Sequence, residues 1–218
     1  MTRGRHPPAD NLYLAAHDGI GGRALLGPGL LAVGLGAALL GELLFWRRLR
    51  LAGDTLHVVD PRPTGDPATT SILARLAATP GPHDPRSWIA HLPATGLATD
   101  LIEQRLISSG ALRKQTRRRL LGSTSSLVFT DPRGPGEPAE RIRTALSYNE
   151  PLDVADLMLA GMILATGLDR FVLDTVNPRD RARLSDQFRR NLPEPLHHLV
   201  AHTREVAVQA GGTLPSSG

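Results

Sequence analysis

The chain has 218 residues, of which 41% are hydrophobic, so it is long enough and apolar enough to form one domain with its own core. It contains no cysteine, which excludes disulfides, thiolate metal sites and cysteine nucleophiles. The formal net charge is +4, and Lys114 is the only lysine among 25 basic residues. Such a ratio is typical of a GC-rich genome and does not by itself indicate phosphate binding.

The two ends of the chain are rich in glycine, proline, serine and other polar residues. We therefore expect a disordered lead at residues 1–9, a globular domain at 10–210 and a disordered tail at 211–218. The first twenty residues carry several charged side chains and lack the apolar segment of a secretory signal. This pattern predicts a protein that stays in the cytoplasm.

A long apolar stretch follows a short predicted helix at residues 11–18 and a glycine loop. Residues 24–46 would, as a helix, just cover a bilayer core of roughly 30 Å. However, Glu42 is costly in lipid, and Pro28 is placed to start the helix and so to shorten it. We expect a buried core helix, with membrane insertion as the less favoured alternative.

The next segments alternate between hairpin and helix patterns. The sequence "LRLAGDTLHVVD" predicts a hairpin that turns at residues 52–54. Asp66 and Asp84 are placed to cap the two helices that follow, and residues 97–109 form a third helix that Gly110 ends. A second hairpin is expected to turn around residues 122–125.

From Glu137 the pattern is helical almost to the end of the chain. Residues 153–168 repeat the apolar, glycine- and alanine-rich composition of the first long helix, so we expect these two helices to pack together at the centre. The predicted fold class is mainly α, a single globular helical domain with short peripheral β-hairpins.

The chain carries none of the common catalytic or cofactor-binding motifs. The glycines of "GPGLLAVGLG" lack the spacing of a dinucleotide or P-loop motif. His198 and His202 share a helix face, but no third ligand or base accompanies them, so a solvated face is the favoured interpretation over a metal site. No G-x-S-x-G motif is present. We expect no enzyme activity, no cofactor and no metal.

The strongest local signal is a segment without acids, residues 104–130, that carries six positive charges. A solvated strand edge is one explanation, because charged edges deter sheet association. A hairpin lying on an anionic membrane is a second. A third is a winged-helix DNA-binding domain, although Asp100 and Glu103 make its helix a poor face for DNA. The basic residues of the hairpin are Arg113, Lys114, Arg117, Arg118 and Arg119.

Several segments, taken in order, resemble the Golgi phosphoprotein 3-like family. They are the apolar helix that runs into "GELLFWRRLRL", the hairpin after it, "PTGD" at 63–66, "SWI" at 87–89, "LISSGAL" at 106–112 and the second hairpin. The resemblance covers residues 11–210. In "PTGD", a tight turn followed by an Asp66 helix cap gives the motif a structural role.

The resemblance implies a mainly helical, non-enzymatic domain at the cytosolic face of a membrane. Eukaryotic members bind phosphatidylinositol 4-phosphate on Golgi membranes, contact the tails of glycosyltransferases and use the hairpin in self-association. An ungapped match places the family's headgroup residues at Gly27, Gly36, Gly96 and Thr99, none of which keeps the family's side chain.

We therefore expect a peripheral membrane protein that binds anionic phospholipid headgroups. Arginines near the family's pocket segments are the candidate replacements, and the hairpin residues named above are the candidates for membrane contact or oligomerisation. The alternatives are a winged-helix-like nucleic-acid-binding regulator and an adaptor for protein partners. The candidate headgroup residues are Arg23, Arg47, Arg48 and Arg105.

Overall fold

The computed structural model describes residues 6–19, 22–119 and 122–212. Within these ranges the chain is mainly helical, as predicted, with two small antiparallel sheets of two strands each. The elements in chain order are α1 (Pro8–Ala15), α2 (Pro28–Phe45), β1 (Leu49–Ala52), β2 (Thr55–Val58), α3 (Pro67–Ala78), α4 (Pro85–Ala94), α5 (Leu97–Ser108), β3 (Leu112–Arg119), β4 (Gly122–Phe129), α6 (Glu137–Ser147), α7 (Val154–Thr166), α8 (Asp169–Val172), α9 (Pro178–Asn191) and α10 (Glu194–Gly212).

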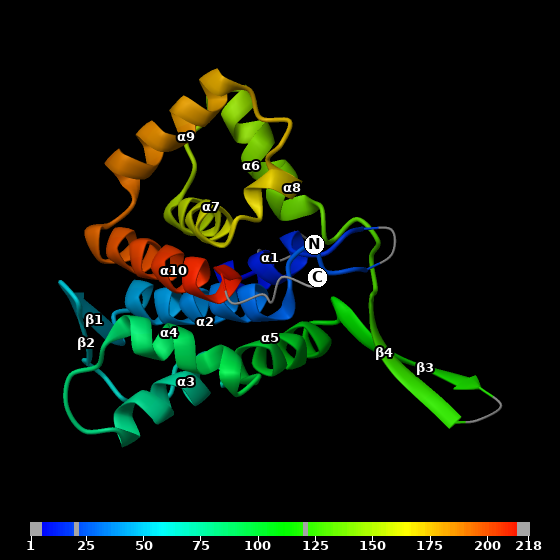
Figure 1. Ribbon diagram of the computed structural model, residues 1–218, viewed down its shortest axis with the longest axis horizontal. Helices are drawn as coiled ribbons and strands as arrows, with labels where there is room; N and C mark the ends of the chain where they lie inside the picture. Colours follow the sequence, from blue (N-terminus) through cyan, green and yellow to red (C-terminus); the bar gives the residue numbers. More distant parts are fainter. Residues whose placement is uncertain (1–5, 20–21, 120–121, 213–218) are drawn as a thin grey trace.

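Helix α2 lies at the centre of the helical body. It packs against α1, α3, α4, α5, α7 and α10, and Figure 1 shows it enclosed between α10 above and α4 below. It is the one described helix long and apolar enough to cross a membrane, and 78% of it is buried inside the fold. This burial agrees with the expected core helix, because the other helices cover the apolar surface that lipid would otherwise have to cover.

The glycines of α2 allow the neighbouring helices to approach closely. A Cβ atom at Gly41 would lie 2.1 Å from Cε of Met158 on α7, and one at Gly34 would lie 2.9 Å from Cγ2 of Thr166. The two apolar helices therefore pack directly on each other, as their similar composition predicted. Asp153 caps α7 by accepting a hydrogen bond from the N–H of Asp156.

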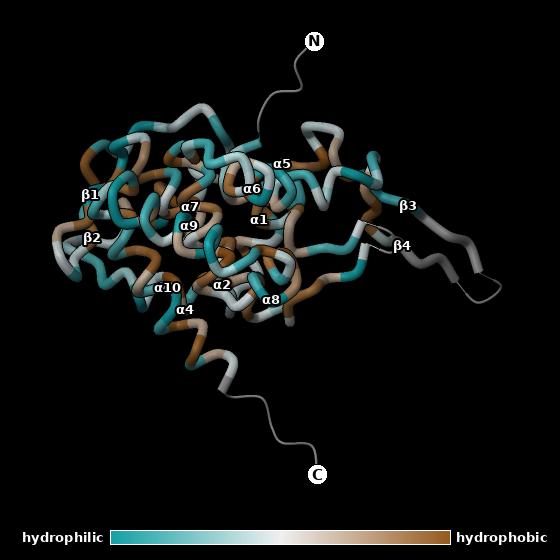
Figure 2. The backbone as a smooth tube through the Cα atoms, turned by 90° about the horizontal axis from the view of Figure 1, so that it is seen from above, coloured by the Kyte–Doolittle hydropathy of each residue, from teal (hydrophilic) through white to brown (hydrophobic). Residues whose placement is uncertain are grey.

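The two hairpins differ in how they relate to the core. The strands β1 and β2 bury Leu49, Leu51 and Leu56 beneath the helices. The β3–β4 hairpin instead extends away from the helical body, as Figures 1 and 2 both show. Its register pairs Leu112 with Phe129 and Arg119 with Gly122.

The predicted turn of the second hairpin was misplaced. Residues 122–125 belong to β4, because the two strands pair without interruption from their base to residues 119 and 122. The connection between the two strands lies outside the described residues. The expected disordered lead was also too long, since α1 begins at Pro8 and Ala9 is fully buried. Of the expected tail, residues 211–212 belong to α10 and residues 213–218 lie outside the described residues.

Candidate functional site

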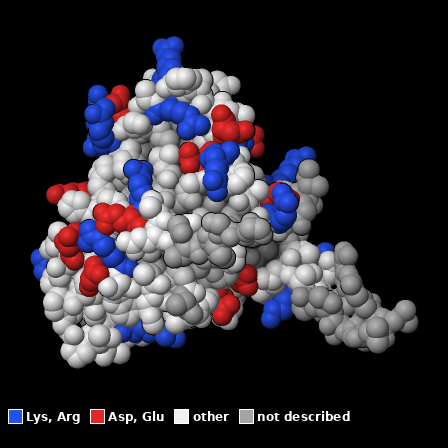
Figure 3. Space-filling view, viewed as in Figure 1, with Lys and Arg blue, Asp and Glu red and all other residues white. Residues whose placement is uncertain are grey.

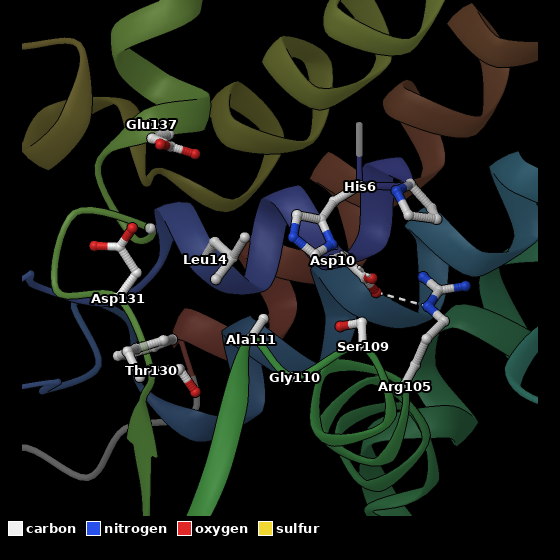
Figure 4. A pocket seen from close by; sticks show the side chains of 13 residues that line it. His6, Asp10, Leu14, Arg105, Ser109, Gly110, Ala111, Thr130, Asp131 and Glu137 are labelled. Carbon is white, nitrogen blue, oxygen red and sulfur yellow. Dashed lines mark hydrogen bonds and ion pairs between the residues drawn. The ribbon is translucent and has the colours of Figure 1, made fainter. Parts of the chain in front are cut away.

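A buried cluster of charged groups connects four helices near the middle of the body. The guanidinium of Arg105 on α5 donates to both carboxylate oxygens of Glu42 on α2, at 3.0 and 3.2 Å. It also donates to Asp10 of α1 at 2.6 Å and to Asp66, at the start of α3, at 3.1 Å. Figure 4 shows Arg105 pointing from α5 toward Asp10. We call these four residues the arginine cluster.

Helix ends explain why carboxylates gather there. The first N–H groups of a helix have no partner within it. The N–H of Ala9, in the first turn of α1, donates to Glu42 at 2.9 Å, so a side chain of α2 caps α1. Asp66 caps α3 by accepting from the N–H of Thr69 at 2.9 Å, which confirms the structural role predicted for the "PTGD" motif. Arg105 then links these two capping carboxylates.

The electrostatics of the cluster are unbalanced, with one guanidinium facing three carboxylates. Burial raises the pKa of Glu42, while the charge and hydrogen bonds of Arg105 oppose that rise. Burial also opposes ionisation of Asp66, but hydrogen bonds from Thr69 and the charge of Arg105 outweigh it, so its pKa lies below the ordinary value. Burial alone would lower the pKa of Arg105, but the carboxylates of Glu42 and Asp10 outweigh it and hold that pKa above its ordinary value.

This arrangement gives Arg105 a structural task in place of the predicted headgroup contact. Its side chain is 11% exposed, and all of its donating nitrogens already face carboxylates. With three acids around it, the cluster repels an approaching phosphate. We therefore leave Arg105 out of the candidate binding site.

A cavity of about 560 Å³ lies beside the cluster, between α1, α5 and the segment that joins β4 to α6. In Figure 4, Asp131 and Glu137 lie across the cavity from Arg105, and His6 lies near Asp10. Within the described residues, no group of three or more histidine or acidic side chains is placed to hold a metal ion. His202, which the sequence predicted to lie with His198 on a solvated helix face, is instead buried on α10.

The carboxyl end of α2 is shaped by an arginine in an unusual conformation. The N–H of Arg47 donates to the carbonyl of Leu44, and the N–H of Arg48 donates to that of Leu43. This is a Schellman motif, in which glycine is usual at the position of Arg47 because the backbone must turn left-handed. Arg47 has φ of 55°, a conformation that disfavours a side chain by roughly 1 kcal/mol or more. An exposed, strained arginine points to a use for its side chain.

A surface pocket of about 500 Å³ lies at this end of α2. Arg47 is exposed, Arg62 has 81% of its side chain exposed, and Arg48 is more enclosed at 23%. The carboxylate of Asp60 lies between Arg48 and Arg62 and forms ion pairs with both. The net charge of these four groups is +2. We call this the arginine pocket; it is lined by Trp46, Arg47, Arg48, Asp60, Arg62 and Thr64.

An apolar slot of about 240 Å³ adjoins the arginine pocket, and Trp46 lines both. Phe45 and Trp46 are 57% and 40% exposed, and they are among the few large apolar side chains that the described surface leaves open to solvent. Met158 and Val154 of α7 form part of the opposite wall. Arginines, exposed aromatics and an apolar slot therefore meet at one end of one helix.

Arg23 and the described basic residues of the hairpin lie away from this pocket. Arg23 is exposed in the loop before α2, so the 18 residues of α2, about 27 Å, separate it from Arg47. Arg113 and Lys114 are exposed on β3, at the opposite end of the long axis from β1 and β2 in Figure 1. The side chains of Arg117, Arg118 and Arg119 lie outside the described residues. Only Arg47 and Arg48 of the four predicted headgroup residues are brought together.

The helix of the proposed winged-helix alternative packs one face on the body and exposes Asp100, Gln104 and Ser108 on the other. Helix α5 packs on α1, α2, α3 and α4, and it buries Ala98, Ile102 and Leu106. Glu103 accepts a hydrogen bond from the hydroxyl of Tyr13 at 3.0 Å, and burial raises the pKa of that carboxyl. On the face of the body seen in Figure 3, acidic and basic side chains are intermingled. Neither feature favours a DNA-binding face.

These observations define a mainly helical protein with an apolar core, one buried cluster of ion pairs and an arginine-lined pocket on its surface. A sequence model of the Golgi phosphoprotein 3 (GPP34) family matches residues 9–203. The chain therefore belongs to this family, as its motifs indicated. No curated protein matches the chain.

Of the glycines that the ungapped match placed at the family's headgroup positions, Gly36 is crowded, whereas nothing lies within 4 Å of a Cβ atom added at Gly27 or Gly96. A Cβ atom at Gly36 on α2 would lie 3.0 Å from Cδ1 and 3.2 Å from Cβ of Leu92 on α4. A side chain at Gly36 would therefore require Leu92 to shift. Gly96 has a left-handed backbone, φ of 67°, at the start of α5.

Sequence reasoning missed Phe45, Trp46, Asp60 and Arg62 as members of one pocket. The aromatic pair was treated as part of the apolar helix, and its exposure follows from the helix ending at residue 45. Arg62 lies 14 residues beyond Arg48, and the β1–β2 hairpin brings the two together. The sequence signal available was the presence of arginine on both sides of that hairpin, at residues 47–48 and 62, with Asp60 beside the second.

Proposed function

We propose that the chain binds the anionic headgroups of a membrane surface through the arginine pocket and catalyses no reaction. The observation that carries this proposal is the exposure of Phe45 and Trp46 directly beside Arg47 and Arg62. Aromatic side chains favour the boundary between headgroups and acyl chains, and arginines pair with phosphates there. Membership of a family associated with Golgi membranes supports a peripheral location at a cytosolic membrane face.

The expected strength of this interaction is modest. Each basic residue near an anionic surface contributes about 1 kcal/mol, so the net charge of +2 in the pocket contributes about 2 kcal/mol. Partial insertion of the two exposed aromatics adds to this electrostatic attraction. The sum supports reversible binding that depends on salt, which suits a peripheral protein rather than an anchored one.

The test compares two charge reversals at opposite ends of the molecule. Arg47→Glu with Arg62→Glu changes the arginine pocket, and Arg113→Glu with Lys114→Glu makes the same change of charge on the exposed hairpin. Co-sedimentation is measured with vesicles of phosphatidylcholine alone and with added phosphatidylglycerol or phosphatidic acid. We expect the pocket variant to lose binding and the hairpin variant to keep most of it.

Each other result has a definite meaning. If only the hairpin variant loses binding, the membrane-binding face is the hairpin and the assignment of the pocket is wrong. If the unmodified chain sediments with none of the charged vesicles, the membrane function itself is wrong. Urea unfolding of both variants checks that they are folded, and neither change involves a buried side chain.

A further inference from the structure

Asp60 occupies the arginine pocket in the way that a bound anion would. Its Oδ1 accepts from Nε of Arg62 at 2.9 Å, and its Oδ2 accepts from Nη2 of Arg62 at 2.8 Å. The same Oδ2 accepts from Nη1 of Arg48. A two-pronged contact from one guanidinium and a third bond from another is the geometry that arginines also use to hold a phosphate.

The backbone fixes this carboxylate in place. The N–H groups of Val59 and Asp60 both donate to the carbonyl of Arg48, at 2.9 and 3.2 Å, and the N–H of Arg62 donates to Oδ1 at 3.1 Å. Hydrogen bonds from Arg62 hold the pKa of Asp60 well below its ordinary value, so the carboxylate is charged at neutral pH. An incoming anion therefore always meets a competitor that is part of the chain and is present at a high effective concentration.

The two arginines differ in how readily they release Asp60. The side chains of Arg48 and Asp60 are 23% and 22% exposed, whereas Arg62 is 81% exposed. Solvent therefore screens the Arg62 pair most, so exchanging Asp60 for a ligand costs less at Arg62 than at Arg48. Asp60 stays beside Arg48 at the edge of the pocket, and its carboxylate faces the ligand.

We propose that Asp60 is a specificity-determining residue, an internal ligand that keeps singly charged phosphodiester headgroups out of the arginine pocket and admits phosphomonoester headgroups. A phosphodiester carries the same single charge as Asp60 and gains little by replacing it. A phosphomonoester carries a charge of about −1.5 to −2 at pH 7 and three acceptor oxygens, so it competes for Arg62 successfully. This inference rests on the proposed function, because it assigns selectivity to the same pocket.

The ligand is a lipid rather than a free phosphate ester, because the exposed Phe45 and the apolar slot adjoin the arginine pocket. A soluble ester would leave both exposed to water. A lipid headgroup at a bilayer surface brings acyl chains close to Phe45 and the slot, and burying these apolar surfaces against each other is favourable. The selectivity therefore concerns lipids with a terminal phosphate.

The experiment measures binding of the full chain to two kinds of vesicle at matched surface charge. One carries phosphatidylglycerol, a phosphodiester, and the other carries phosphatidic acid, a phosphomonoester. We expect the unmodified chain to bind the phosphatidic acid vesicles about fivefold more tightly, since one extra charge contributes about 1 kcal/mol. Asp60→Asn should strengthen binding to phosphatidylglycerol and reduce the difference to within about twofold.

Two further variants separate selectivity from net charge and from folding. Glu140→Gln removes one negative charge from the exposed surface of α6, far from the pocket along the chain, and should leave the preference for phosphatidic acid intact. Asp60→Ser repeats the loss of the carboxylate with a smaller side chain and should match Asp60→Asn. Urea unfolding establishes that each variant is folded before its binding is compared.

The outcomes are distinct. If both vesicles bind equally and Asp60→Asn changes neither, the inference is wrong and the proposed function stands. If no vesicle binds, both are wrong. If soluble glycerol 3-phosphate binds as tightly as phosphatidic acid vesicles, the lipid source is wrong, because the aromatics and the slot then contribute nothing.

Discussion

The arginine cluster and the arginine pocket lie near the same end of α2 and use arginine in opposite ways. In the cluster, Arg105 is enclosed by three carboxylates and ties helix ends together. In the pocket, arginines outnumber the one carboxylate, and Arg62 faces solvent. Glu42 and Trp46, one helical turn apart, belong to the two regions. The ratio of acid to base around a guanidinium, together with its burial, separates a structural arginine from a binding one.

The largest expected effect on stability comes from a substitution in the arginine cluster. Arg105→Leu removes the guanidinium that three carboxylates, largely out of water, share. Breaking a buried ion pair by removing one partner typically costs about 3–5 kcal/mol, so we expect a loss of that size in the free energy of unfolding. Urea denaturation measures it, with Arg62→Leu as the matched change in the pocket. An equal, small loss of unfolding free energy in both variants would contradict the distinction between a structural and a binding arginine.

A smaller loss is expected from Glu42→Gln. The amide keeps the shape and one acceptor for the N–H of Ala9, and Arg105 retains Asp10 and Asp66. Because burial already disfavours the charge on Glu42, the net cost should be about 1–3 kcal/mol, the range for a hydrogen bond to a charged group. Thermal unfolding compared with Arg105→Leu gives the order of the two effects, and the reverse order would show that Glu42 dominates the cluster.

The pH dependence of stability tests how much the charge of Asp66 contributes. Its pKa is lowered from the ordinary value of 3.8, so its stabilisation is present above that pH and is lost as the pH falls through the folded pKa. Asp66→Ala should cost about 1–2 kcal/mol at pH 7, since a helix cap and an ion pair are removed. The difference between variant and unmodified chain should shrink as the pH falls below 3.8, measured by urea denaturation. A difference independent of pH would exclude a contribution from the charge.

The smallest effect on stability is expected in the pocket, and its sign is reversed. Arg47→Gly relieves the left-handed conformation and should raise the free energy of unfolding by up to about 1 kcal/mol. The same variant should bind anionic vesicles about fivefold more weakly, because one basic residue is lost. Denaturation and co-sedimentation on one preparation measure both. Unchanged binding would mean that the strained arginine serves no purpose at the membrane.

Much of the fold was predictable because its signals are local. Asp66 and Asp84 cap helices where the sequence placed caps, and Pro28 starts α2. The turn of the second hairpin was misplaced because glycine and serine favour turns in isolation, whereas the register of the whole hairpin decides where the chain reverses.

The site was harder to predict because charge alone does not reveal burial. Arg105 and Arg47 look alike in the sequence, and only the tertiary contacts of α5 with α1, α2 and α3 enclose the first. Arg62 joins Arg48 through the β1–β2 hairpin, a contact that helical spacing does not reveal. The family resemblance identified the chain correctly, but one of the headgroup positions it implied, Gly36, lies tightly against Leu92.

The exposed β3–β4 hairpin has a consequence for the solubility of the chain. A sheet of two strands has two open edges, each with unpaired N–H and C=O groups that a strand of another molecule can use. Like charges on Arg113 and Lys114 keep such edges apart at low ionic strength. Salt shortens the range of that repulsion to roughly 3 Å at 1 M, so concentrated chains should associate edge to edge as salt is added.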